Sequence, residues 1–537
     1  VHPDHHAFYI HPKDSKFLIN GNDGGLNISH DGGKTWRFAE NLPLGQFYHI
    51  NIDNDIPYNI YGGMQDNGSW VGPAYVWRSG GIRNSYWNEV MFGDGFDVVP
   101  DAEDNRYGFA MYQGGNVSRY DKETGQNHKI KPMHPKGLPL RFNWNGAIAQ
   151  DPFNNSALYF GSQYVHYTAD KGNSWKIISP DLTTNDSAFQ KQATSGGLTI
   201  DATQAENYTS IICVSPSSIN KDIIWVGTDD GNIQLTINGG ADWSIQNSKL
   251  KGLPKNGWIP QIITSTFNEK EAWVVVNNYR NNDWKPYLYY TNNSGESWRN
   301  LVDESKVSGH CLSFVQDPVE PNLLFLGTEN GLYFSLNKGD AWQRWWKGYP
   351  HVSSMDMKIQ AREKDLVVGT FGRAAFVFDD LEPLRSAAEK GGEDFGELKM
   401  FAVRDAYLAY NAAATGTRFT ADAIFKGDNR KRGALVSYWK SFEKAEEIEK
   451  TDEAKEKKDR KKEKLHVVIF NQEGDTIRNF IAKPDTGLNR MYWDLSRNGV
   501  RYPSYAKPKK DAEPSRGPGV SPGKYLIKMI EGSIRDS

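Results

Sequence analysis

The sequence has few cysteines, no long apolar run and almost no net charge. Only 2 of its 537 residues are cysteine, Cys213 and Cys311, which is too few for a zinc centre or a disulfide framework. They lie at non-equivalent places, so we expect two buried free thiols. No apolar segment approaches the roughly 18 to 20 residues that a membrane-spanning helix needs. The formal net charge of −3 excludes a general nucleic-acid binder, because such proteins carry a net basic surface.

Familiar catalytic and metal-binding patterns are also absent. The sequence contains no Gly-x-Ser-x-Gly, no His-Glu-x-x-His and no P-loop, and none of its acidic turns has the ligand spacing of a Ca²⁺ loop. Its start is rich in histidine (His2, His5, His6 and His11), but we expect a frayed end there. No metal and no cofactor are therefore predicted. No signal-like segment lies at Val1, so the chain is interpreted as a fragment or processed product.

Aromatic residues and glycine are abundant instead. Aromatics make up 13% of the chain, with 17 Trp, 26 Tyr and 51 Gly. This mixture is typical of many short strands joined by tight turns, with flat side chains packed between sheets. At 537 residues the chain is too long for one compact core, so two or more domains are expected.

Five motifs of the form Ser/Thr-x-Asp/Asn-x-Gly-x-x-Trp, here termed box motifs, recur at residues 29–36, 168–175, 236–243, 291–298 and 335–342. In such a turn the Asp or Asn side chain accepts hydrogen bonds from backbone N–H groups ahead of it, and the glycine supplies a positive φ. The Trp then folds back and buries its ring beside the turn. We therefore predict a structural role for Asp31, Trp36, Asp170, Trp175, Asn238, Trp243, Asn293, Trp298, Asn337 and Trp342.

A second repeating feature is an apolar, strand-like segment that usually ends in glycine. Eight such segments lie at residues 17–21, 59–62, 108–112, 158–161, 223–227, 273–276, 323–327 and 366–369. Two of them, 59–62 and 108–112, are not followed by a box, so two repeats in the long gap between Trp36 and Trp175 have lost it. A period of about 40 to 50 residues leaves room for four short strands per repeat, which is typical of a propeller blade. The sequence therefore predicts an all-β protein in which residues 1–380 form a β-propeller of seven or eight four-stranded blades. A larger or double propeller is left open.

The repeats end after Asp380. Residues 381–410 are predicted to be a linker with a short helix at 381–390, and residues 411–537 a small Ig-like β-sandwich. The segment 443–464 is almost entirely charged, so it is predicted to be a solvated helix or loop inserted between strands.

The repeats resemble the BNR/Asp-box superfamily, which includes sialidases, two-propeller xyloglucanases and the sortilin (VPS10) luminal domain. A narrower resemblance is to large, exported, sortilin-like proteins of Bacteroidetes. It is carried by residues 61–73 (YGGMQDNGSWVGP), 93–96 (GDGF), 118–121 (SRYD), 179–183 (SPDLT), 487–494 (GLNRMYWD) and 522–525 (PGKY). The last two segments resemble a C-terminal FlgD-like domain. The resemblance covers essentially the whole chain. It implies a longer N-terminal region, a secreted, periplasmic or cell-surface location, and a binding surface, but fold alone does not decide catalysis.

Blade topology limits where a ligand could bind. The turn after the second strand and the approach to the next blade's first strand share one face, here termed the mouth face, and the box turns lie on the opposite face. Asp-Gly and Asn-Gly pairs are also what tight hairpins require, so a purely structural role stays open for each candidate. The predicted ligand-binding residues on the mouth face are Gln65, Asn67, Trp144, Asp229, Asp230, Glu329, His310 and Arg373, with Asp23, Gln46, Tyr48, Gln113, Tyr208, Gln261 and Asn330 beside them.

Carboxylates, amides and aromatic rings around a channel mouth suit recognition of a sugar or a peptide. The preferred hypothesis is a noncatalytic binding or scaffold protein whose partner is a protein or polysaccharide, for example in an outer-membrane or cell-surface complex. The alternative is a glycoside hydrolase resembling the two-propeller xyloglucanases. It would use Asp66 and Asp94 as paired carboxylates about 5 to 10 Å apart across a cleft. A sialidase is disfavoured, because it needs an arginine triad and only Arg373 stands out on this face.

Overall fold

The computed structural model describes residues 1–188, 190, 208–392, 395–441, 465–503, 505 and 513–531. The chain forms two compact units. The first unit is Val1–Leu381 together with Ala413–Asn429, and the second is Glu382–Ala412 together with Arg430–Ser537. The charged segment predicted at 443–464 lies outside the described residues.

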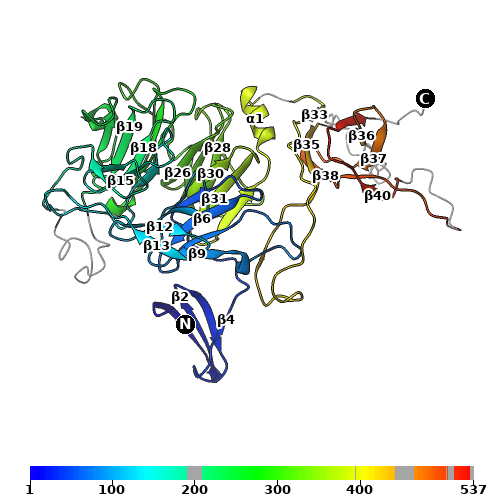
Figure 1. Ribbon diagram of the computed structural model, residues 1–537, viewed down its shortest axis with the longest axis horizontal. Helices are drawn as coiled ribbons and strands as arrows, with labels where there is room; N and C mark the ends of the chain where they lie inside the picture. Colours follow the sequence, from blue (N-terminus) through cyan, green and yellow to red (C-terminus); the bar gives the residue numbers. More distant parts are fainter. Residues whose placement is uncertain are drawn as a thin grey trace, which may run out of the picture. The chain divides into compact units, whose positions relative to one another are not determined.

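Seven antiparallel sheets of the first unit follow one another around a ring in chain order (Figure 1). Blade 1 consists of β5 (Ile50–Ile52), β6 (Asn59–Met64), β7 (Gly68–Pro73) and β9 (Asn88–Met91). Blade 2 consists of β10 (Val98–Pro100), β11 (Tyr107–Tyr112), β12 (Asn116–Asp121) and β13 (Gln126–Lys129). Blade 3 consists of β14 (Ile148–Gln150), β15 (Leu158–Gly161), β16 (Val165–Thr168) and β17 (Lys176–Ile177).

The remaining four blades continue the same order. They are β18 (Ile211–Pro216), β19 (Ile224–Thr228), β20 (Ile233–Thr236) and β21 (Ser244–Ile245); β22 (Trp258–Thr264), β23 (Ala272–Asn278), β24 (Asp283–Thr291) and β25 (Arg299–Asn300); β26 (Cys311–Gln316), β27 (Leu324–Thr328), β28 (Gly331–Ser335) and β29 (Gln343–Arg344); and β30 (Ser354–Gln360), β31 (Asp365–Thr370) and β32 (Ala375–Phe378). The predicted β-propeller is thus confirmed, with a seventh blade of three strands.

An eighth four-stranded sheet precedes the ring. It consists of β1 (His5–His11), β2 (Asp14–Asn22), β3 (Gly25–Ser29) and β4 (Arg37–Phe38). The ring closes without this sheet, because blade 7 pairs directly with the chain just before blade 1. Gln46 forms a β-bridge to Phe371, and the Phe47 amide donates to the Thr370 carbonyl oxygen at 3.0 Å. All eight apolar segments predicted from the sequence are second strands of these eight sheets.

The core of the propeller is divided into clusters between neighbouring blades. Between blades 5 and 6, Trp273 of β23 stacks on Phe314 of β26 with ring centroids 5.2 Å apart. Between blades 7 and 1, Val367 packs in one buried cluster with Phe47 and Ile50. Each blade therefore depends on its neighbours for burial of both faces, which favours a closed ring.

The five box motifs form the expected turns after third strands. In the turn that follows β16, Thr168 Oγ1 accepts the Gly172 amide at 3.0 Å, Asp170 Oδ1 accepts the Ser174 amide at 2.9 Å, and Gly172 has φ +88°. The Trp175 indole donates to the Ile130 carbonyl oxygen of blade 2 at 2.7 Å. The box Trp therefore ties its own blade to the preceding one. The other four turns repeat the hydroxyl and carboxyl or amide contacts.

Residues 413–429 belong to the first unit, although the sequence places them in the sandwich. β34 (Lys426–Gly427) pairs with β8 (Ile82–Arg83), and the buried Arg83 guanidinium donates to the carbonyl oxygens of Thr415 and Thr417, each at 2.7 Å. These contacts join positions more than 330 residues apart, which no local pattern reveals.

The second unit begins with α1 (Glu382–Glu389), inside the predicted helix. One sheet contains β33 (Leu398–Met400), β35 (Ala434–Lys440) and β38 (Gly487–Trp493), and another contains β36 (Leu465–Phe470), β37 (Thr476–Ala482) and β41 (Leu526–Glu531). The short pair β39 (Ser496–Asn498) and β40 (Arg516–Gly519) completes it. The buried Tyr438 and Val467 contribute to one core from the two larger sheets, as expected of a β-sandwich.

Cys213 and Cys311 are buried and free, as predicted. Burial raises the pKa of each thiol to about 12. Among the described residues there is no helix with the length and apolarity that crossing a membrane requires.

Candidate functional site

First strands of the blades line a central channel with a cavity of about 850 Å³. The ionisable residues that line it include His49 and Asp97 from blades 1 and 2, and Asp356 and Lys358 from blade 7. His49 Nδ1 lies 3.6 Å from Asp356 Oδ2, and its Nε2 lies 2.7 Å from Asn145 Nδ2.

The charges of His49, Asp97, Asp356 and Lys358 influence one another. Burial alone would lower the pKa of His49, but the carboxylates of Asp97 and Asp356 outweigh it and raise that pKa. Burial raises the pKa of Asp97. Lys358 and His49 overcome burial at Asp356 and lower its pKa. This cluster joins blade 7 to blade 1, so we assign it a structural role.

At the mouth face, Asp66 and Asp94 come together. The Asp66 amide donates to Asp94 Oδ1 at 3.0 Å, and the Trp144 indole nitrogen donates to Asp94 Oδ2 at 3.0 Å. The Asp94 amide donates to Gln113 Oε1 at 3.2 Å. Asp66 itself has φ +61°, which places its carboxyl group beside the neighbouring turn. Both oxygens of Asp94 are thus occupied within the protein.

The Asp94 carboxyl group also acts electrostatically on that of Asp66. Burial, Asp94 and Asp23 all disfavour the charged form of Asp66 and raise its pKa to about 6. A glycosidase pair is separated by about 5 to 10 Å so that the sugar or a water fits between the carboxyls. Here the Asp94 carboxylate instead accepts the Asp66 amide directly, an arrangement that differs from that of a glycosidase pair.

Tyr48 links this acidic group to the rest of the mouth. Its hydroxyl donates to Gln65 Oε1 at 2.9 Å, and its ring contacts Phe96 and the exposed Phe371 with centroids 4.8 and 5.5 Å away. Burial raises the pKa of Tyr48 to about 12, with Tyr279, Asp94 and Asp66 acting in the same direction and Arg280 opposing them. Tyr48 of blade 1 therefore lies within electrostatic range of blade 5 across the opening.

Blade 5 contributes a cation held on aromatic rings. Arg280 lies in η3 (Tyr279–Asn281), the turn between β23 and β24. Its guanidinium carbon is 3.4 Å from the centroid of the Trp258 ring and 4.4 Å from that of Tyr279. The Trp258 indole donates to the Tyr208 hydroxyl at 3.2 Å. Arg280 is exposed as a whole, but partial desolvation of its guanidinium lowers its pKa, while Tyr279, Tyr208, Tyr48 and Asp229 act in the opposite direction.

His310 extends this aromatic surface. Its ring lies 4.8 Å from Tyr279 and 5.7 Å from Trp284, measured between centroids, and Trp284 is 51% exposed. His310 Nδ1 is 3.2 Å from Glu329 Oε2. Burial lowers the pKa of His310 against the opposing effect of Glu329. His310 and Glu329, both predicted to bind ligand, are thus brought together at the mouth.

Other predicted residues have their polar atoms engaged within turns. The buried Asp229 carboxylate accepts the Ser210 amide and hydroxyl and the Asn143 side chain, and Asp230 accepts the Thr184 amide at 2.8 Å. Asn67 Nδ2 donates to carbonyl oxygens of Asp23 and Gln65. Gln261 accepts the Phe314 amide at 2.6 Å. Arg373 is exposed in the turn after β31. The ligand-binding role of these residues stays a prediction.

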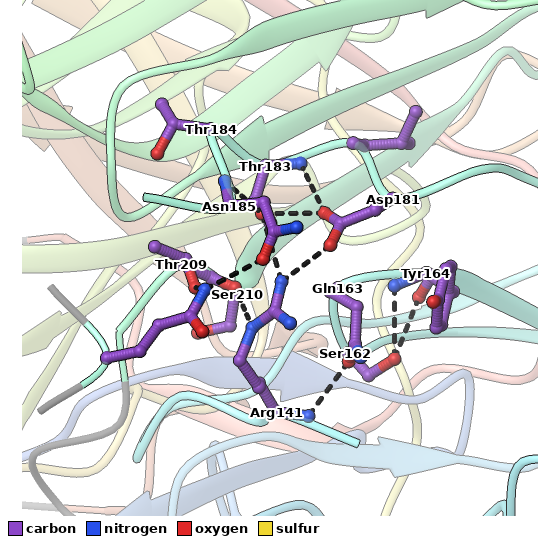
Figure 2. Close-up of polar contacts among 12 residues, drawn as sticks. Arg141, Ser162, Gln163, Tyr164, Asp181, Thr183, Thr184, Asn185, Thr209 and Ser210 are labelled. Atoms are coloured by element: carbon purple, nitrogen blue, oxygen red, sulfur yellow. Dashed lines mark hydrogen bonds and ion pairs between the residues drawn. The ribbon is translucent and has the colours of Figure 1, made fainter. Parts of the chain in front are cut away.

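A polar network anchors the mouth-face loop that follows β17. Figure 2 shows the Arg141 side chain reaching between Asp181 and Thr209. Arg141 Nη2 lies 2.7 Å from Asp181 Oδ2, its Nε donates to the Thr209 carbonyl oxygen at 3.1 Å, and its amide donates to Gln163 Oε1 at 2.8 Å. Asp181 Oδ1 also accepts the Thr183 amide at 3.0 Å. The Ser-Pro-Asp-Leu-Thr segment therefore ties blade 3 to the start of blade 4.

Sequence reasoning missed Arg280, Trp258, Tyr279 and Trp284. Arg280 could have been found by the rule used for the other blades, which assigns the turn after the second strand to the mouth face. Because β23 ends at Asn278, Tyr279 and Arg280 occupy that turn in blade 5. The apolar segment 273–276 lacks the terminal glycine that six of the other seven segments carry, which hid the position of the turn.

No protein-family model matches this chain, and no curated protein matches it. A solved structure described as "YCF48 bound to D1 peptide" matches over 63% of this chain and 95% of its own, with 12% sequence identity and a TM-score of 0.42. A match at this level says nothing about the site.

Proposed function

We propose that this chain is a noncatalytic binding protein that captures a protein or glycan ligand at the channel mouth of its propeller. The second unit then serves as a docking module, and the protein acts outside the cytoplasm, as the resemblance to exported sortilin-like proteins implies. The mouth offers a guanidinium, a group of carboxyls and several exposed rings within one opening. Such a mixture fixes and orients a polar ligand.

The observation that carries the proposal is the position of Arg280. Its guanidinium carbon lies over Trp258, 3.4 Å from the ring centroid, yet the residue is exposed. Its one described hydrogen bond is the long contact of 3.5 Å from Nη1 to Asn277 Oδ1. Arginine presents five N–H donors in a planar fork that fits a carboxylate. A stacked, exposed arginine is therefore well prepared to receive an acidic group.

The aromatic surroundings favour a glycan that carries this acidic group. Trp284 and Phe371 are exposed at 51% and 36%, and Trp258 and Tyr279 lie beside Arg280. Flat rings provide apolar faces for sugar rings, and the few polar groups beside them fix orientation. We therefore favour an oligosaccharide with uronic acid units, and treat an acidic peptide as the competing outcome.

Hydrolysis has weaker support. A retaining or inverting glycosidase needs two carboxyls with room between them for the substrate or a water. Asp66 and Asp94 are in contact, and both Asp94 oxygens already accept hydrogen bonds. The catalytic role of this pair stays a prediction. Analysis of the oligosaccharides after the binding experiment would reveal any hydrolysis products.

The experiment is a binding screen with the full chain. Uronic-acid oligosaccharides, the same oligosaccharides as methyl esters, and glutamate-rich peptides are immobilised side by side. The proposal predicts retention on the free acids and loss on the esters, because esterification removes the charge that Arg280 receives. Retention on the peptides alone would replace the glycan by a protein partner. Equal retention on acids and esters would contradict the role of Arg280.

A further inference from the structure

We propose that His2, Asp4, His6 and Asp23 form a binding site for a divalent transition metal, with Zn²⁺ as the expected ion. This inference concerns the sheet of β1 to β4 and is independent of the proposed function. It departs from the sequence-based expectation of a frayed, metal-free start.

His2, Asp4 and Asp23 converge on one turn, and His6 reaches the same turn through its contact with Asp23. Asp23 lies in the turn between β2 and β3, His6 lies on β1, and His2 and Asp4 lie just before β1. The potential ligand atoms of His2, Asp4 and Asp23 are all within 4.8 Å of one another. His2 Nδ1 is 3.7 Å from Asp4 Oδ2, and His6 Nε2 is 2.6 Å from Asp23 Oδ1.

These separations suit a small tetrahedral ion. Ligand atoms about 2.0 to 2.1 Å from Zn²⁺ lie roughly 3.3 Å apart at the corners of a tetrahedron. The His2–Asp4 and His6–Asp23 contacts, at 3.7 and 2.6 Å, bracket this value. The ligand atoms of His2, Asp4 and Asp23 lie within 4.8 Å of one another, so shifts of up to about 1.5 Å would bring these three into position, with His6 moving in beside Asp23. Two imidazole nitrogens and two carboxylate oxygens favour a transition metal, because Ca²⁺ and Mg²⁺ prefer oxygen ligands alone.

The backbone brings the ligands together without help from a metal. The Asp23 amide donates to the Asp4 carbonyl oxygen at 3.2 Å, and the Gly24 amide donates to Asn22 Oδ1 at 3.0 Å. A Cβ at position 24 would lie 3.0 Å from the His2 Cβ. Glycine at this position therefore allows His2 to lie close over the turn.

Asp23 also joins this site to the propeller. Its carbonyl oxygen accepts Asn67 Nδ2 at 2.9 Å, and its carboxyl group contributes to the raised pKa of Asp66. A metal on Asp23 would thus fix the β2–β3 turn at the rim of blade 1. The expected role is structural: it holds the N-terminal sheet against the mouth face.

The test uses the full chain, purified without a polyhistidine tag, and measures Zn²⁺ by elemental analysis after dialysis and by titration. Wild type should hold one Zn²⁺ per chain. His6→Ala and Asp23→Asn should each bind at least about tenfold more weakly, since each removes one ligand. Co²⁺ in place of Zn²⁺ should give the intense visible absorption of a tetrahedral site.

His5→Ala is the matched control. His5 is the neighbour of His6 on β1, but its Nδ1 lies 3.1 Å from Asn20 Oδ1, so this variant should keep full Zn²⁺ affinity. Circular dichroism checks that each variant is folded. If Asp23→Asn does not fold, His2→Ala takes its place as a variant that lacks one ligand. Absence of Zn²⁺ binding at micromolar concentration, or equal affinity in the His6 and His5 variants, would overturn the proposal.

Discussion

Arg280, in the turn between β23 and β24, and Trp258, at the start of β22, belong to the same blade, and the arginine guanidinium lies 3.4 Å from the centroid of the indole ring. The contact holds a cation at the channel mouth within electrostatic range of Tyr48 on the far side of the ring. A cation–π contact of this kind contributes about 0.5 to 2 kcal/mol of interaction free energy and holds the guanidinium over the face of the ring. The proposed recognition of acidic ligands depends on this orientation.

Replacing Trp258 with leucine should weaken binding of an acidic oligosaccharide roughly two- to thirty-fold, the range that corresponds to the loss of one cation–π contact. Arg280 keeps its charge in this variant but loses its support. Titration calorimetry against the free acid measures the change. An unaltered Kd would show that the stacking does not prepare Arg280 for the ligand.

Replacing Asp170 with asparagine should lower Tm at pH 7 and leave it unchanged near pH 2. Hydrogen bonds from the Ser174 hydroxyl and amide lower the pKa of Asp170 from 3.8 to about 2. Because the pKa of this carboxyl group is lower in the folded than in the unfolded state, its ionised form stabilises the protein at any pH above the unfolded-state pKa. This stabilisation disappears as the pH falls from about 4 to about 2. Asparagine accepts the same amide in three natural box turns, so the variant should still fold.

Asn293→Asp is the reciprocal control. Asn293 Nδ2 donates to Ser297 Oγ at 2.8 Å, and the serine can donate instead to a carboxylate, as Ser174 does to Asp170. This variant should gain Tm at pH 7 and lose the gain over the same acid range. A Tm difference that ignores pH in both variants would contradict the assigned role of the box carboxylate.

Closure of the ring should depend on Asp356. Its carboxylate is buried and accepts the Ile50 amide of blade 1 at 3.0 Å. Asp356→Ala leaves that amide without its partner, which costs about 1 to 3 kcal/mol of unfolding free energy, and removes the counter-charge of His49. Asp356→Asn should cost less. Scanning calorimetry measures both, with Asp340→Ala, at an exposed ion pair, as the control that should change little.

Neither thiol should react in the folded protein. Cys213 and Cys311 are 8% and 0% exposed, and burial raises the pKa of both to about 12. At pH 8 the nucleophilic thiolate is therefore scarce. A thiol reagent should modify no cysteine natively and two per chain in denaturant. Rapid modification of either one in the native state would contradict the described burial.

The blades could be predicted because their signals are local. A box such as 168–175 encodes its own turn, and an apolar run such as 158–161 encodes a buried second strand. Closure could not be predicted, because the bond from Ile50 to Asp356 joins residues 306 positions apart. Topology placed Asp66, Asp94 and His310 on the mouth face, and their role in binding or catalysis stays a prediction. Stacking of Arg280 on Trp258 could not be predicted, because it depends on side-chain directions that sequence spacing does not reveal.

The most direct test of mouth-face binding compares two arginines of blade 5. Arg280 lies at the mouth, and Arg299 begins β25 just after the box turn on the opposite face, where it pairs with Asp340 at 2.8 Å. Titration of a uronic-acid oligosaccharide into Arg280→Met and Arg299→Met should show at least about a tenfold loss of affinity in the first and wild-type affinity in the second. Wild-type affinity in Arg280→Met, or an equal loss in both, would contradict the account.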